Sequence, residues 1–199
     1  LKRETGLKTI VDGNLSDPDL EERLILENKL DFVGMGRPLF ADPWWPEKAR
    51  RGREEEILPC IRCMQCINRV FFGQYAACSV NPFTGKEYLG PLAPVKKAKR
   101  ILIAGGGPAG MYAAVLASER GHRVTLIEKG DRLGGHLRGA SVPAHKKEVY
   151  GFYKWLLKRV ENSDIELKLG TEVTPELVRQ LKPDAVIVAT GSVPSLPQV

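Results

Sequence analysis

The sequence predicts an α/β fold, and three observations support this prediction. Short runs of apolar and β-branched residues alternate with helical periodicity, first within residues 1–40 and again from residue 100 onward. A glycine-rich loop at residues 105–110 joins a buried strand to a helix. Between these parts, residues 41–94 are irregular, interrupted by prolines, and hold all four cysteines of the chain.

The first 40 residues indicate a strand, a helix and a second strand. The β-rich run at residues 7–11 is followed by a helix start, in which Asp17 can cap the helix and Pro18 can occupy its first turn. Residues 31–36 form a second short apolar run. Two strands joined by a helix make a βαβ crossover, so we expect the strands to pair in parallel.

The cysteine pattern favours an iron–sulfur cluster in a reducing compartment. Two residues separate each of the first three cysteines, and the fourth follows after eleven residues, which gives Cys60, Cys63, Cys66 and Cys78. A disulfide framework would spread its cysteines along the chain. Structural zinc, the alternative, usually takes two separated C-x2-C pairs, whereas close tripling favours a [4Fe–4S] cluster. A cluster would also supply the organising energy that a long irregular stretch needs.

From residue 100 the alternation of strands and helices returns. Buried or half-buried strands are expected at residues 101–104, 124–127, 165–169 and 185–188. Helices are expected at residues 111–120, where Gly121 can end the helix, at 145–160, and from Thr174 onward. This order predicts a parallel sheet with helical connections.

The glycine-rich loop has the pattern of a dinucleotide-binding turn, G-x-G-x-x-G. Its residues are Gly105, Gly107, Pro108, Ala109 and Gly110, in the strand-to-helix position where backbone N–H groups and the helix dipole face a pyrophosphate. The acidic residue expected after the second strand is Glu128, followed by Lys129. A carboxylate there accepts hydrogen bonds from ribose hydroxyls and repels a 2′-phosphate, which favours FAD, NAD or ADP over NADP.

Two further turns favour FAD at this fold. Gly135 and His136 lie just past the acidic strand, where a second turn can face phosphate. Ala189, Thr190 and Gly191 end a buried strand with small residues that can approach a cofactor.

Composition narrows the class of protein. With 43% hydrophobic and 27% charged residues and a mean hydropathy of −0.21, the chain is typical of a globular protein. No apolar run approaches the roughly 20 residues that cross a bilayer, and no secretory signal opens the chain, so we expect a cytoplasmic protein without membrane partners. The net charge of +6 comes from two local clusters of basic residues rather than one face, so no nucleic-acid partner is expected. Because the chain opens on Leu1 in mid-pattern, we expect a piece of a longer protein.

Four ordered motifs resemble a known group of enzymes. They are Gly36-Arg37-Pro38 with Ala41-Asp42-Pro43, the cysteine run with Pro59 before it, Asn81-Pro82 with Gly85 and Glu87, and the glycine loop. Together they resemble the NADH:flavin oxidoreductases of the 2,4-dienoyl-CoA reductase, enoate reductase and trimethylamine dehydrogenase group. The resemblance covers essentially the whole chain.

The resemblance implies three segments. Residues 1–45 would be the last two strands of an FMN-binding (β/α)8 barrel, 46–95 an iron–sulfur segment, and 96–199 a Rossmann-like FAD-binding domain. Gly13, Asn14, Gly36 and Arg37 would contact the FMN phosphate, since late barrel loops are a suitable phosphate site and arginine offers a forked cation.

The resemblance also implies an activity. Electrons would pass from NAD(P)H through FAD and the [4Fe–4S] cluster to FMN, and would reduce the C=C bond of an enoate or dienoyl-CoA. The family's catalytic side chains fall outside this chain, so no catalytic residue is assigned and the piece alone is expected to be inactive. Two alternatives are a trimethylamine-dehydrogenase-like enzyme holding ADP in its dinucleotide fold and a non-catalytic electron-transfer subunit. Substrate identity and self-association are left open.

Overall fold

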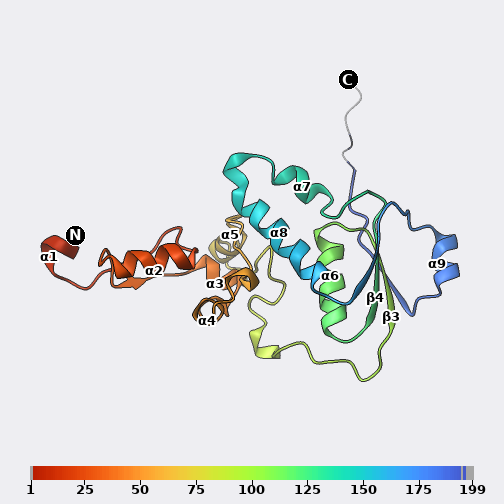
Figure 1. Cartoon of the computed structure of the whole chain (residues 1–199), viewed down its shortest axis with the longest axis horizontal. Helices are drawn as coiled ribbons and strands as arrows, with labels where there is room; N and C mark the ends of the chain where they lie inside the picture. The colour runs from red at the N-terminus through yellow and green to blue at the C-terminus, as the bar shows by residue number, and fades with distance from the viewer. Residues whose placement is uncertain (1, 194, 196–199) are drawn as a thin grey trace. The chain divides into compact units, whose positions relative to one another are not determined.

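The computed structural model describes residues 2–193 and 195, and the chain divides into two compact units, Leu1–Gly90 and Pro91–Val199 (Figure 1). Each unit is described here by itself. The expected division into three segments stays a prediction, and its outer limits, Leu1 and Val199, lie outside the described residues.

The first unit begins with the predicted βαβ crossover. Strand β1, Ile10–Val11, pairs in parallel with β2, Phe32–Val33, and α2, Pro18–Leu26, connects them. The prediction of parallel pairing is confirmed. The strands are shorter than the apolar runs that predict them, because each has a single neighbour and only two residue pairs are in register. Helix α1, Lys2–Thr5, precedes them.

Local polar contacts hold this crossover in place. Asp17 caps α2 by accepting a hydrogen bond from Leu20 N at 3.4 Å, and proline occupies the first helical turn. Asp31, just before β2, accepts from Thr9 N at 2.9 Å and pairs with Lys2 at 3.0 Å. The Thr9 backbone hydrogen bond, followed by Lys2, holds the pKa of the Asp31 carboxyl well below its ordinary value.

Short helices occupy the irregular middle of the chain. They are α3 at Arg37–Ala41, α4 at Trp45–Arg50, the 3-10 turn η1 at Glu54–Glu56, α5 at Gln65–Phe71 and the 3-10 turn η2 at Glu87–Leu89. The buried apolar side chains of the first unit are few: Leu30, Ala41, Trp45, Leu58, Cys66 and Val80. This part therefore has only a small hydrophobic core.

The second unit contains a four-stranded parallel sheet, which confirms the α/β prediction. Its strands are β3 at Arg100–Ala104, β4 at Arg123–Ile127, β5 at Ile165–Lys168 and β6 at Ala185–Val188, in the order β5-β4-β3-β6. Its helices are α6 at Pro108–Glu119, α7 at His136–Ala140, the 3-10 turn η3 at Ala144–Lys146, α8 at Lys147–Glu161 and α9 at Pro175–Leu181. Such a strand order is that of half a doubly wound nucleotide-binding sheet.

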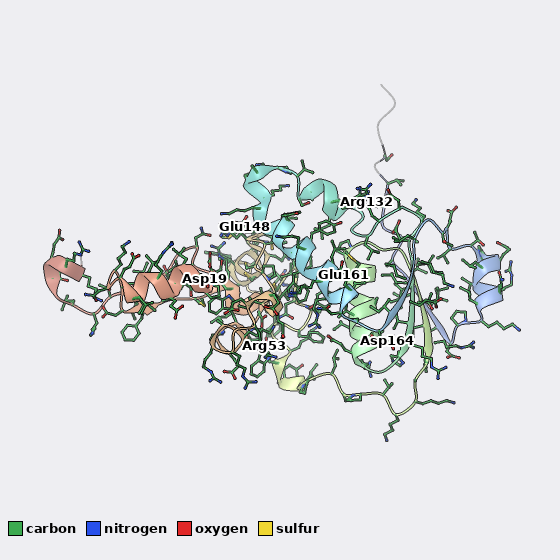
Figure 2. The ribbon with its side chains drawn as sticks, viewed as in Figure 1. Asp19, Arg53, Arg132, Glu148, Glu161 and Asp164 are labelled. Carbon is green, nitrogen blue, oxygen red and sulfur yellow. The ribbon has the colours of Figure 1, made fainter. Side chains whose placement is uncertain are left out.

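The core of this unit lies between the sheet and α6, with α8 packed against α6 (Figure 1). Ile103, Leu126, Met111 and Leu156 are fully buried there. Near the two ends of α8, Glu161 is exposed and Glu148 is half-buried (Figure 2). None of the helices in the described part of the chain is long and apolar enough to span a bilayer.

Candidate functional site

The first candidate site lies at the carboxyl edge of the four-stranded sheet. The glycine loop follows β3 and opens α6, and Ala189 follows β6, the neighbouring strand. Ala189 N donates to Ala104 O at 2.8 Å, so the two strand ends meet. The chain order reverses between β3 and β6, and in open α/β sheets ligands bind in the crevice outside such a reversal.

Each glycine of the loop has its own steric environment. A Cβ on Gly105 would lie 2.3 Å from Ala189 O, and the positive φ of 108° also requires glycine there. A Cβ on Gly110 would lie 1.9 Å from Gly105 O, because α6 starts directly against the strand end. Around Gly107, by contrast, nothing lies within 4 Å of the added atom. Gly105 and Gly110 therefore serve packing, and Gly107 faces open space that a pyrophosphate could occupy.

Glu128 lies at the end of β4, where the sequence predicts a ribose contact, and it also holds the loop. Its Oε2 accepts from Gly106 N at 2.6 Å, and its Oε1 accepts from Gly130 N at 2.7 Å. A carboxylate has about four lone-pair positions, so these two bonds leave acceptor capacity for ribose hydroxyls. Lys129 beside it is exposed.

A second glycine turn lies over the first. Gly134 N donates to Gly106 O at 2.8 Å, and a Cβ on Gly135 would lie 3.2 Å from Gly107 Cα. The sequence predicts a cofactor contact at Gly135, and the structure brings it next to the glycine loop. His136 begins α7 and is exposed, as are Thr190 and Gly191 at the sheet edge.

A separate cavity of about 490 Å³ lies at the opposite end of the strands. Its polar lining comes from the amino ends of β3 and β4 and from residues at the start of β5, namely Arg100, Arg123, Thr125, Asp164 and Glu166. Nucleotides bind at the carboxyl edge of such sheets, and this cavity contains none of the glycine turns. The carboxyl edge, and not this cavity, therefore stays the predicted nucleotide site.

The second candidate site lies in the first unit, where β1 and β2 end side by side. Gly34 N donates to Val11 O at 2.8 Å. The predicted phosphate residues, Gly13 and Asn14 after β1 and Gly36 and Arg37 after β2, therefore follow adjacent strand ends. Gly13 and Asn14 are exposed, and both have positive φ values, 107° and 62°.

Arg37 also reaches the cysteines. It is the first residue of α3, and its Nη1 donates to Met64 Sδ at 3.0 Å. Met64 lies between Cys63 and Cys66 in the sequence. Because a guanidinium carries five N–H donors, this contact leaves others for an anion.

The chain path around the cysteines is strained. Arg62 and Met64 both have left-handed φ values, 54° and 61°, which are uncommon for residues other than glycine. They alternate with the first three cysteines, so the backbone turns sharply between ligand positions. Farther along, Cys63 Sγ lies 3.2 Å from Ser79 Oγ, next to the fourth cysteine.

The surroundings of Cys60 change the ionisation of its thiol. Burial raises the pKa of the Cys60 thiol, and the thiols of Cys78 and Cys66 act in the same direction, while the Arg62 backbone and the Arg37 charge oppose them. In residues 2–193 and 195 no three His, Cys, Asp or Glu side chains gather closely enough to hold a metal ion. In a cubane each thiolate binds a different iron, so its four ligands do not converge on one point. Four thiolates are the donor set of such a cluster, and both the cluster and its ligand assignment stay predictions.

Sequence reasoning missed three buried polar residues beside the cysteines: Asp42, Asn81 and Thr84. The first two belong to the motifs that carry the resemblance, but no role is predicted for them. Asp42 and Asn81 could have been noticed in the sequence, because each precedes a proline, in Asp42-Pro43 and Asn81-Pro82, and such pairs favour turns.

Comparison with known proteins agrees with this geometry. The family model described as an NAD(P)-binding Rossmann-like domain matches residues 103–156, which include the glycine loop and Glu128. NADH oxidase of Thermoanaerobacter brockii is 41% identical over 100% of this chain and 31% of its own length. Cinnamate reductase of Clostridium sporogenes is 36% identical over 98% of this chain and 29% of its own.

A solved structure extends the likeness to the whole fold. A 2-naphthoyl-CoA reductase complex superposes with a TM-score of 0.91 at 33% identity, over 99% of this chain and 31% of that one. These homologues belong to the NADH:flavin oxidoreductase group, and this chain is similar to one part of them. It spans about three tenths of the length of these relatives. Amine dehydrogenases are among the homologues as well as reductases.

Proposed function

We propose that this chain is the electron-transfer part of an iron–sulfur flavoprotein that uses NAD(P)H to reduce the C=C bond of an unsaturated acid or acyl-CoA. Bound flavin and a [4Fe–4S] cluster would supply the exchange between hydride transfer and single-electron transfer. Cys60, Cys63, Cys66 and Cys78 would hold the cluster. The reductases among the homologues support the reaction class, and the particular substrate is not assigned.

One observation carries the proposal: Arg37 belongs to two candidate sites at once. It follows the paired strand ends at which a flavin phosphate would bind, and it contacts Met64 between two of the cysteines. A residue that touches both places keeps a flavin and a cluster near each other, as electron transfer between them requires. An isolated electron-transfer subunit would have no use for the β1-β2 pair.

In the second unit, the residues of the carboxyl edge would bind and orient FAD. The start of α6 directs backbone N–H groups toward the space beside Gly107, which suits a pyrophosphate. Glu128, fixed by Gly106 and Gly130, would accept hydrogen bonds from the adenosine ribose. Gly135 would close over the same space.

Anaerobic titration with NADH tests the proposal. The intact, cofactor-loaded enzyme that contains this chain should lose its visible flavin absorbance as NADH is added. Subsequent addition of an enoate such as cinnamate should restore that absorbance. Unchanged flavin absorbance in excess NADH would contradict the proposed donor.

An amine dehydrogenase with ADP in the dinucleotide fold is the second candidate. It is favoured by the amine dehydrogenases among the homologues, and Glu128 would bind the ribose of ADP equally well. The same titration separates the two, because such an enzyme would be bleached by an amine and not by NADH. Extraction and chromatography of the bound nucleotide would identify FAD or ADP directly.

A further inference from the structure

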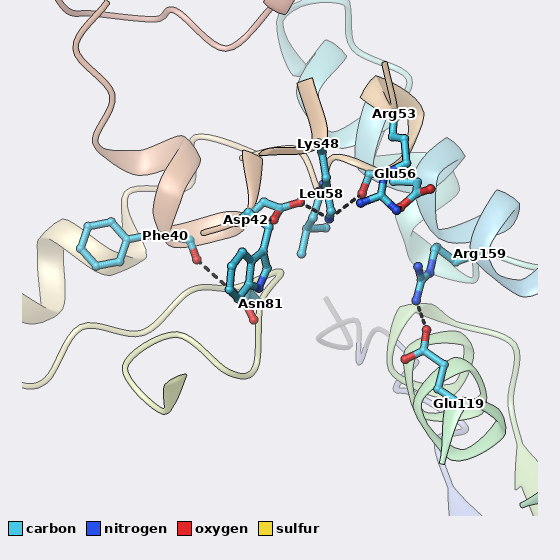
Figure 3. Close-up of polar contacts among 10 residues, drawn as sticks. Phe40, Asp42, Lys48, Arg53, Glu56, Leu58, Asn81, Glu119 and Arg159 are labelled. Atoms are coloured by element: carbon cyan, nitrogen blue, oxygen red, sulfur yellow. Dashed lines mark hydrogen bonds and ion pairs between the residues drawn. The ribbon is translucent and has the colours of Figure 1, made fainter. Parts of the chain in front are cut away.

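The four cysteines lie on a stretch of chain whose two ends are held by one short segment. We define residues 58–84 as the cysteine loop. At its start, Leu58 N donates to Asp42 Oδ2 at 2.9 Å. At its end, Asn81 Nδ2 donates to Phe40 O at 3.2 Å (Figure 3). Thr84 Oγ1 donates to the same oxygen at 2.7 Å. The acceptors at both ends lie close together in the chain, because Phe40 is in α3 and Asp42 directly follows this helix.

The three polar side chains at the base of the loop, Asp42, Asn81 and Thr84, are buried and hydrogen-bonded. Asp42, Asn81 and Thr84 are 3%, 7% and 6% exposed, and Glu21 is the other buried polar residue that the described ranges contain. Buried polar groups are tolerated when they are hydrogen-bonded. Lys48 Nζ completes the set, since it lies 2.5 Å from Asp42 Oδ2 and 3.0 Å from Glu56 O.

Asp42 and Asn81 each also fix the turn in which they lie. Asp42 Oδ1 accepts from Trp44 N at 3.0 Å, and Asn81 Oδ1 accepts from Phe83 N at 2.9 Å. In both cases the side chain bonds the backbone two residues on, across a proline, which is an Asx turn. A side chain held by its own turn keeps one orientation, so the contacts across the base of the loop are preorganised.

Leu58, Cys66 and Val80 are buried within the loop, but apolar burial does little to order the stretch between the third and fourth cysteines. Val70, Phe71, Phe72 and Tyr75, between the third and fourth cysteines, are 57%, 84%, 74% and 93% exposed. Closing a loop costs conformational entropy that some interaction must offset. The polar contacts at the base of the loop supply part of what a hydrophobic core would otherwise provide.

We propose that Asp42, Asn81 and Thr84 are positioning residues that close the base of the cysteine loop and thereby govern how firmly the protein retains its iron–sulfur cluster. The inference rests on the proposed function, because it takes the cysteines as cluster ligands. Partners that orient ligands strongly affect the retention of a bound metal. None of the three residues would touch the cluster, and each acts by fixing where the ligand-bearing chain begins and ends.

A pair of substitutions at Thr84 tests this in the cofactor-loaded protein. Thr84→Val keeps the shape and removes the hydroxyl, whereas Thr84→Ser keeps the hydroxyl. We expect Thr84→Val to lose iron to a chelator roughly three- to tenfold faster than the unmodified protein, because it removes the buried hydroxyl that donates to Phe40 O and Asn81 O. Thr84→Ser should lose iron at the unmodified rate. The decay of the cluster's visible absorbance under anaerobic chelation measures both.

Two further variants complete the test. Asp42→Asn should accelerate iron loss at least as much, because an amide nitrogen cannot accept from Leu58 N or pair with Lys48. It provides the same comparison if Thr84→Val does not fold. Glu47→Gln is the matched control, since this carboxylate in α4 pairs with Arg50 and Arg51 at the surface. FAD content should stay unchanged in all variants.

Two results would overturn the inference. One is an unchanged rate of iron loss in both Thr84→Val and Asp42→Asn, and the other is equal acceleration in Thr84→Ser and Thr84→Val. A different result, unmodified protein without iron and sulfide, would overturn the proposed function and the inference with it.

Discussion

At the scale of single residues, Glu128 combines two roles in the nucleotide loop, one structural and one in binding. Its two oxygens accept hydrogen bonds from Gly106 N and Gly130 N, and the same carboxylate stands where a ribose would bind. Sequence spacing predicts the second role and gives no sign of the first. Both roles concern the second unit, so a substitution of Glu128 should affect that unit and leave the cysteines of the first unit unchanged.

We expect Glu128→Ala to weaken FAD retention at least tenfold and to destabilise the second unit by about 1–3 kcal/mol, because two loop N–H groups lose their acceptor. Iron content should stay intact, since the cysteines belong to the other compact unit. Glu166→Gln is the control, a carboxylate of the same sheet that bonds Thr125 Oγ1 away from the loop. Measuring FAD and iron per chain checks this, and parallel loss of both groups would contradict it.

At the scale of the elements, the turn from β3 into α6 separates packing from binding. Gly110 admits no side chain, because an added Cβ would lie 1.9 Å from Gly105 O. Gly107 faces open space. One substitution should therefore damage the fold and the other only the ligand.

We expect Gly110→Ala to destabilise the second unit by about 3 kcal/mol, the upper range for overpacking. Gly107→Ala should leave the melting temperature within a few degrees and reduce FAD affinity, because the methyl group enters the proposed pyrophosphate space. Gly151→Ala in α8, where nothing lies within 4 Å, is a helix control. Thermal unfolding with and without added FAD checks the set, and a normal melting temperature for Gly110→Ala would be the contrary result.

Helix α2 carries a buried acid without a function in the proposal. Glu21 is 6% exposed, and its Oε1 has no hydrogen-bond partner. Burial, followed by the charge of Asp17, raises the pKa of Glu21 from 4.5 to about 7. A raised folded-state pKa means that the folded chain binds the proton more tightly than the unfolded chain does. Its contribution to stability is therefore full below pH 4.5 and is lost as the pH rises to about 7.

We expect Glu21→Gln to stabilise the first unit by on the order of 1–3 kcal/mol at pH 8 and to have little effect at pH 4. Glu22→Gln, on the exposed side of the same helix, should change stability little at either pH. Denaturant midpoints at the two pH values check this. An equal gain at both would show that the benefit does not come from removing a buried charge.

At the scale of the whole molecule, regular elements could be predicted from the sequence and the irregular middle could not. Most strands and helices after residue 100 follow their hydrophobic periodicity, and the strand-loop-helix context of the glycine loop places it at the sheet edge. These features are local, so a short window of sequence contains them. The prediction that residues 185–188 are buried is wrong, because β6 is an edge strand and its four residues are exposed. The sequence also does not predict the short helix α7.

The contacts around the cysteines are of another kind. Asp42 reaches Leu58, Phe40 reaches Asn81 and Thr84, and Arg37 reaches Met64. Each joins residues 16 to 44 positions apart, and no periodicity encodes them. The Asx-Pro pairs announce turns but not the partners of those turns. Only the folded chain reveals that α3 holds both ends of the cysteine loop.

The central claim is that the cysteines hold an iron–sulfur cluster within a flavoprotein. The most direct test is the content of iron, acid-labile sulfide, zinc and FAD per chain after anaerobic purification. The proposal predicts about four irons with an equal amount of sulfide, the content of one cubane, together with one FAD. One zinc without sulfide would contradict it, because the cysteines would then form a structural zinc site.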